Sequence, residues 1–216
     1  MPGQVISDFK LHNELDMSRT PIKQALMQLK SDGLIIERGG RGYEVRRITE
    51  EDIIDLFDAR EGIECTALKI ALKKGIPLKI MNDLLYLNQC VTAANNEKDY
   101  EKVFDYDSEL HVKLIGSSNN KRLIEYYNMI LLQLRRMRLL TYFQKTLPGE
   151  AVKEHALIFS AISNNEEEKA LNILSAHILD TKNHYVEILR NSIKTDADFM
   201  VLKYLIGNNL RIESAN

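Results

Sequence analysis

Helix-breaking residues are rare in this 216-residue chain, and their scarcity constrains the fold more than any other feature. The four prolines stand at positions 2, 21, 77 and 148, and glycine is sparse beyond position 42. The long segments between them carry apolar side chains at three- and four-residue spacing, which is the period of an amphipathic helix. The pattern predicts a mostly α-helical protein.

The larger part of the chain is predicted to be an antiparallel bundle of six or seven helices. Its helices are expected to end at Gly75 and at Gly116-Ser117-Ser118, and one helix is expected to begin with Pro77 in its first turn. The expected helices span about 50–74, 77–94, 97–116, 120–144, 149–163 and 166–192. An apolar cluster after residue 195 predicts one further short helix.

Charge changes sign near residue 48. Residues 1–47 hold eight Lys and Arg against six Asp and Glu, a net of +2, whereas residues 48–216 hold 21 against 25, a net of −4. Thr49 followed by three acidic residues is typical of a helix start. We expect a small domain at 1–47, a helical domain at 48–195 and a C-terminal tail at 196–216.

Composition excludes several classes of protein. The net charge of 29 minus 31, or −2, means that any nucleic-acid contact must come from a local patch. No run approaches the roughly 18 apolar residues that a membrane span needs, and the first residues lack the pattern of a secretion signal. Two cysteines without C-x-x-C spacing make no disulfide framework. We expect a cytoplasmic protein that makes no membrane contact.

The small domain is predicted to contain two helices joined by a tight turn. Ser7 can cap a helix over residues 8–15, and Ser18 can cap a second helix after a turn at Asp16-Met17. The second helix would bury one apolar stripe and leave polar side chains outside, at its N-terminal end. This arrangement is typical of a helix-turn-helix, in which such side chains contact DNA. The apolar stripe is Ile22, Ala25, Leu26 and Leu29, and the outer side chains include Arg19, Thr20, Lys23 and Gln24.

A short β-hairpin is expected directly after these helices. Residues 34–38 and 43–46 flank the glycine-rich turn at residues 39–42. Its arginines, at positions 38, 41, 46 and 47, suit a wing that lies on the phosphate backbone. A nucleotide-phosphate loop is the poorer interpretation, because no helix with Lys-Ser/Thr follows. His12 is expected to be an exposed polar residue of this domain.

These motifs resemble the winged helix-turn-helix of GntR-family bacterial transcription regulators. The resemblance rests on residues 15–26, Leu29, Gly33-Leu34-Ile35 and residues 41–45. It implies DNA contacts from Arg19, Thr20, Lys23 and Gln24, with wing contacts around Arg41 and Gly42. Lys23-Gln24 stands where the family usually has Arg-Glu. Pro2-Gly3 resembles the Pro-Gly that precedes the second helix of that family, and the domain is expected to lack the first helix. Residues 196–216 or a partner chain would then cover the apolar face of the remaining helices, or the domain would be loosely packed.

Four side chains in the larger part have spacings that suit a metal site. Asp107 and His111 are four residues apart on one predicted helix and share its face, while His155 and His177 lie on two other helices. Each histidine taken singly would be structural or exposed. Three imidazoles and a carboxylate pointing into one bundle would bind a divalent transition metal and leave positions open.

Residues 55–180 resemble the helical effector domain of the FadR/FCD subgroup of that family. The matching features include Ala59-Arg60 with Glu64, the Asp-x-x-x-His pair, and residues 134–138. The resemblance implies that Asp107, His111, His155 and His177 bind the metal, with zinc first and nickel, manganese or iron as alternatives. His184, two turns after His177, is the rival ligand.

Arginines near the expected cavity are candidates for binding a small carboxylate effector. They are Arg60, Arg135, Arg136 and Arg138. The last three cannot all point inward, because successive helical positions are about 100° apart.

The sequence therefore predicts a metabolite-responsive transcription regulator rather than an enzyme. Effector binding would alter the spacing of two DNA-binding domains in a homodimer that binds a palindromic operator. One alternative is a metal-dependent enzyme, for which Glu64 or Glu154 could serve as the base. The other is a sensing partner that does not itself bind DNA.

Overall fold

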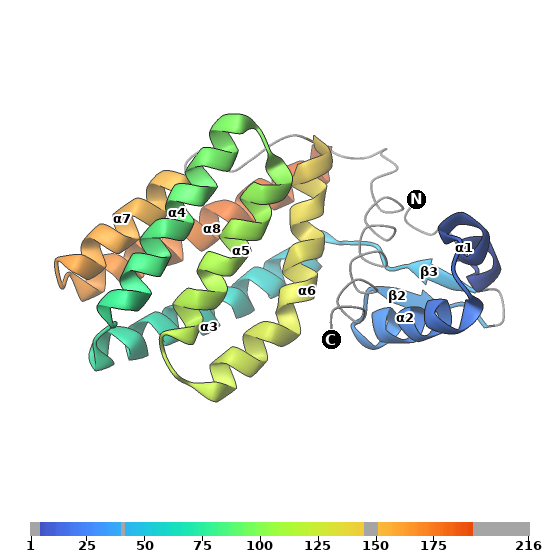
Figure 1. The fold of residues 1–216 in the computed structure, drawn as a ribbon, viewed down its shortest axis with the longest axis horizontal. Helices are drawn as coiled ribbons and strands as arrows, with labels where there is room; N and C mark the ends of the chain where they lie inside the picture. The colour runs from blue at the N-terminus through green and yellow to red at the C-terminus, as the bar shows by residue number, and fades with distance from the viewer. Residues whose placement is uncertain (1–4, 40–41, 145–150, 192–216) are drawn as a thin grey trace. The chain divides into compact units, whose positions relative to one another are not determined.

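The computed structural model describes residues 5–39, 42–144 and 151–191. As predicted, these residues are mostly helical, with eight helices and one small sheet (Figure 1). They divide into two compact units, with the boundary between Thr49 and Glu50. None of the helices in these ranges combines the length and the apolar character that a membrane crossing requires. The helix expected after residue 195 falls outside the described ranges.

The first unit contains the two expected helices, α1 (Asp8–Leu15) and α2 (Arg19–Ser31). The Ser7 side chain caps α1 by accepting a hydrogen bond from the backbone N–H of Lys10 at 3.1 Å. Ser18 occupies the N-cap of α2, but its side chain makes no capping hydrogen bond. Between the helices, Asp16 adopts a left-handed conformation with φ of 52°, which makes the turn tight.

His12 corrects one expectation. We predicted an exposed side chain, but it is partly buried, and its Nδ1 lies 2.5 Å from the carbonyl oxygen of Met17. This hydrogen bond ties the end of α1 to the turn before α2. A polar side chain in a helix-turn-helix can therefore help to hold the turn.

The sheet has three antiparallel strands in the order β1-β3-β2. The predicted hairpin is β2 (Ile35–Glu37) and β3 (Tyr43–Val45), in which Ile36 is paired with Glu44. Gly39 and Gly42 have φ of 49° and 98°, conformations that glycine adopts readily. The strand β1 (Val5–Ile6), which pairs with β3, was not predicted, because two residues are too short to show a strand period.

The apolar stripe of α2 is buried as its spacing predicts. Ile22, Leu26 and Leu29 are fully enclosed, and Ala25 is nearly so. They belong to a small core with buried residues of α1 and the hairpin, namely Leu11, Leu34, Ile35 and Val45. This burial fixes which face of α2 points to solvent.

The second unit is the predicted bundle of six helices. They are α3 (Glu50–Lys74), α4 (Leu78–Glu97), α5 (Tyr100–Gly116), α6 (Lys121–Gln144), α7 (Ala151–Ser163) and α8 (Glu167–Asn191). Each lies within a few residues of the expected range. The α3 helix packs against α5, α6 and α8, while α7 packs against α8 and α4 (Figure 1). This arrangement brings side chains from α3, α5, α7 and α8 into one interior.

Candidate metal centre and DNA-contacting face

Three histidines meet inside the bundle. His111 comes from α5, His155 from α7 and His177 from α8, and each is at most 2% exposed. A potential ligand atom from each lies within 4.8 Å of those of the other two. The ring centroids of His155 and His177 are 4.6 Å apart, and those of His111 and His177 are 5.4 Å apart. Residues far apart in sequence thus form one compact cluster.

Asp107 lies beside two of these rings. Its Oδ1 is 3.7 Å from Nε2 of His111, one helical turn further along α5, and 3.6 Å from Nε2 of His155. The four predicted ligands are therefore neighbours in space. His184 is not a member of the histidine cluster; it is half-buried, and its ring contacts that of Tyr185.

Two carboxylates, the buried Glu64 and the partly buried Glu154, orient two of the imidazoles. Nδ1 of His111 lies 2.7 Å from Oε2 of Glu64, and Nδ1 of His177 lies 2.7 Å from Oε2 of Glu154. A carboxylate accepts a hydrogen bond, so each contact places the ring proton on Nδ1. The tautomer then leaves Nε2 with a lone pair available to a ligand, which is how metal-binding histidines are usually held.

His155 differs from the other two histidines of the cluster in its hydrogen bonding. It is 1% exposed, and neither of its ring nitrogens has a hydrogen-bond partner among the described residues. Burial and the neighbouring His177 hold its pKa well below the usual value, so the ring is neutral. An unpaired buried polar group destabilises a fold by about 1–3 kcal/mol. Coordination of a cation would satisfy it, so the residues fit a divalent metal.

Arg60 and Glu64 form a buried ion pair next to the cluster. Nε of Arg60 donates to Oε1 of Glu64 at 2.6 Å, while Nη2 of Arg60 lies 2.9 Å from Nε2 of His111. Burial by itself raises the pKa of Glu64, but the charge of Arg60 and the hydrogen bonds from His111 and Arg60 more than offset this and hold that pKa well below its usual range. Glu64 is therefore ionised and contacts both neighbours.

The other candidate arginines lie on α6. Arg136 is buried, whereas Arg135 is exposed, because adjacent helical positions point in different directions. The side chain of Arg138 lies outside the described part of the chain.

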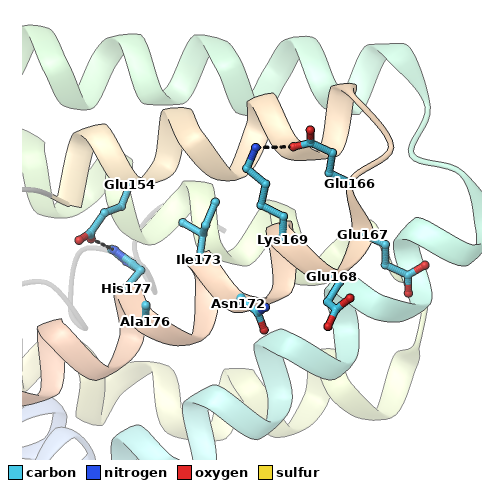
Figure 2. A pocket seen from close by; sticks show the side chains of 9 residues that line it. All are labelled: Glu154, Glu166, Glu167, Glu168, Lys169, Asn172, Ile173, Ala176 and His177. Carbon is cyan, nitrogen blue, oxygen red and sulfur yellow. Dashed lines mark hydrogen bonds and ion pairs between the residues drawn. The ribbon is translucent and has the colours of Figure 1, made fainter.

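An open depression of about 660 Å³ borders the cluster along α8. Figure 2 shows Glu154 and His177 at one end of it, joined by their hydrogen bond, and Glu166, Glu167 and Glu168 at the other. The Glu154 side chain is 20% exposed, whereas His177 is buried. Glu154 thus separates the buried imidazole from solvent on this side.

The polar face of α2 is exposed over its first two turns. Arg19, Thr20, Lys23 and Gln24 all point away from the core of the first unit. The guanidinium carbon of Arg19 lies 6.0 Å from the centroid of the Phe9 ring, a cation–π contact with α1. In the hairpin, Gly42 lies in the turn, and Arg41 falls outside the described residues.

One wing arginine has a partner that the sequence pattern did not indicate. Arg38 forms an ion pair with Glu44 across the hairpin, with Nε and Oε2 2.5 Å apart. This pairing partly neutralises the positive charge expected of the wing.

The sequence pattern indicated Glu64 and Glu154 as possible catalytic bases, and Glu64 also as part of the family resemblance. Their orienting role was missed. For Glu64, the four-residue spacing from Arg60 signals an ion pair on one helix face. For Glu154, no local signal exists, because its partner His177 is 23 positions away on another helix.

Comparison with known proteins defines the class. Residues 55–180, more than half of the chain, match the model of the FCD domain. The chain is 24% identical over 194 residues to the Nta operon transcriptional regulator of Aminobacter aminovorans, covering 89% of each chain. It is 20% identical to the HTH-type transcriptional repressor RspR of Escherichia coli K12, covering 82% of this chain and 77% of that one.

Solved structures agree on the fold. The McbR/YncC protein of Escherichia coli aligns with a TM-score of 0.72 at 18% identity, covering 86% of this chain and 88% of that one. A putative GntR regulator from Rhodococcus sp. RHA1 aligns with a TM-score of 0.69 at 22% identity and the same coverage. The chain belongs to the FCD-domain group of GntR-family transcriptional regulators.

Proposed function

We propose that this regulator holds a divalent transition metal through Asp107, His111, His155 and His177 and responds to a small carboxylate effector. The observation that carries the proposal is His155, which is buried and neutral and has no hydrogen-bond partner among the described residues. Around it, Glu64 and Glu154 hold the other two imidazoles with Nε2 unprotonated. A bound cation would stabilise such a cluster, because it would accept the lone pairs that these rings present.

The donor set favours zinc. Three imidazole nitrogens and one carboxylate oxygen suit zinc, and nickel, manganese and iron are the alternatives. A bound ion would supply a Lewis-acidic centre with open positions, at which an anionic oxygen could bind. Arg60 is the arginine best supported as the second contact of that anion, because it already reaches His111.

The output is DNA binding. The relatives are named as transcriptional regulators. Contacts to a DNA operator are supported by the exposed α2 residues Arg19, Thr20, Lys23 and Gln24. Arg41 and Gly42 would contact the phosphate backbone of the DNA. We propose a cytoplasmic homodimer on a palindromic operator. Effector and operator would affect each other's binding reciprocally, typically by about 1–3 kcal/mol.

A metal-dependent enzyme is the less favoured alternative. Its two candidate bases, Glu64 and Glu154, each accept a hydrogen bond from a histidine of the cluster, and Glu64 also accepts one from Arg60. Carboxylates engaged in this way orient ligands and are poorly placed to take a proton from a substrate.

Metal analysis of the purified protein tests the proposal. Mass spectrometry of wild type should find about one metal ion per chain, and both Asp107→Ala and His155→Ala should lower that content. Undiminished metal in both variants would refute the site. A mobility-shift assay on the DNA upstream of the gene tests the output, and a complete lack of binding would favour a sensing partner that does not bind DNA.

A further inference from the structure

Nε2 of His111 already has a partner. Because Glu64 holds the ring proton on Nδ1, Nε2 can only accept, and Nη2 of Arg60 lies 2.9 Å from it. A neutral imidazole has a single acceptor lone pair, in the plane of the ring. That lone pair can accept a guanidinium N–H or bind a metal ion, but it cannot do both.

We infer that Arg60 and the metal compete for His111, so that metal binding displaces the Nη2 arm of Arg60. The inference rests on the proposed metal centre and states how the contact between Arg60 and His111 changes when the metal binds. Arg60 keeps Nε2 of His111 satisfied until the cation arrives, and its release places a guanidinium N–H at the same site.

The displaced arm stays beside the centre because Glu64 retains the rest of the guanidinium. Oε1 of Glu64 accepts from Nε of Arg60, while Oε2 accepts from Nδ1 of His111. Arg60 and Glu64 are each at most 1% exposed, and separating a buried ion pair is strongly destabilising. Only the Nη2 contact needs to break. The freed N–H is then a charge-assisted donor for an anionic oxygen, which is the chemistry of a carboxylate.

The variant Arg60→Lys tests the Nη2 contact with His111 separately from the positive charge of the side chain. Lysine keeps the positive charge next to the cluster but lacks the planar fork that reaches Glu64 and His111 together. Zinc affinity, measured by competition with a chromophoric chelator, should therefore rise roughly tenfold, since a hydrogen bond to a charged group is lost from the metal-free state. Arg122→Lys, at an exposed arginine of α6 paired with Glu125, is the matched control and should leave the affinity unchanged.

Nitrogen NMR of the wild-type protein gives a test that does not depend on how the variant folds. In the metal-free protein, the Nε and Nη2 protons of Arg60 should both exchange slowly with water. On zinc addition, the Nη2 protons should lose protection while the Nε proton keeps it. Retention of both sets of protected protons would overturn the competition.

The measurements distinguish failure of the competition for His111 from failure of the metal centre itself. Zinc binding by wild type with equal or weaker binding by folded Arg60→Lys overturns the competition and leaves the metal centre standing. Failure of wild type to bind zinc overturns the metal centre, and the competition with it.

Discussion

Glu154 on α7 accepts a hydrogen bond at 2.7 Å from Nδ1 of His177 on α8. The bond joins two helices and sets the tautomer of a buried ring that belongs to the histidine cluster. Glu64 makes the same contact with His111 from α3. Two carboxylates outside the histidine cluster therefore set the tautomers of two of its three rings.

Glu154→Gln should weaken metal binding. The amide keeps the shape of the side chain but loses the charge that favours a proton on Nδ1, and loss of such an orienting partner lowers metal affinity by about 10- to 100-fold. Zinc competition with a chromophoric chelator measures the change. Glu168→Gln alters the same depression without a contact to His177 and is the control. An equal loss in both variants would mean that only surface charge matters.

The stability of the metal-free protein should fall in acid partly because of His155. Burial depresses the pKa of His155 in the folded protein below its usual value of 6.5, so its contribution to stability is fully present above pH 6.5 and is lost as the pH falls below it. His155→Leu should lose less unfolding free energy than wild type between pH 7 and pH 5, by up to about 1.4 kcal/mol per pH unit. Urea unfolding with a chelator present measures the two slopes. Identical slopes would contradict a buried neutral His155.

Zinc should stabilise the wild-type protein against unfolding. A ligand that binds only the folded state at about 100 times its dissociation constant adds about 2.7 kcal/mol. Thermal unfolding with and without zinc should show a higher Tm in wild type and little shift in Asp107→Ala. An equal shift in both would place the zinc elsewhere.

Arg19→Ala should weaken specific DNA binding by about 1–3 kcal/mol if the side chain contacts a base. Lys30→Ala provides the control, since Lys30 lies in the last turn of α2 and is paired with Glu37. Mobility-shift titrations at fixed salt compare the two. An unchanged footprint and affinity for Arg19→Ala would count against α2 as the DNA-contacting helix.

Most of the fold could be predicted, because helices of 13 to 25 residues repeat their period several times. The short strand Val5–Ile6 could not, since its existence depends on pairing with β3. The His12 contact with Met17 was missed for a similar reason: it forms only when the turn folds.

The candidate ligand set could be named from the sequence, whereas the contacts that orient its side chains could not. Asp107 and His111 share a helix face by spacing alone, and the family resemblance added His155 and His177. The contacts of Glu154 with His177 and of Arg60 with His111 join different helices, 23 and 51 positions apart. Such contacts depend on how the helices pack, which no local pattern encodes.

X-ray absorption spectroscopy at the zinc edge of the zinc-loaded protein tests the central claim most directly. The account predicts three imidazole ligands at about 2.0–2.1 Å with oxygen completing the coordination. A spectrum that lacks imidazole scattering, or one dominated by sulfur, would contradict it.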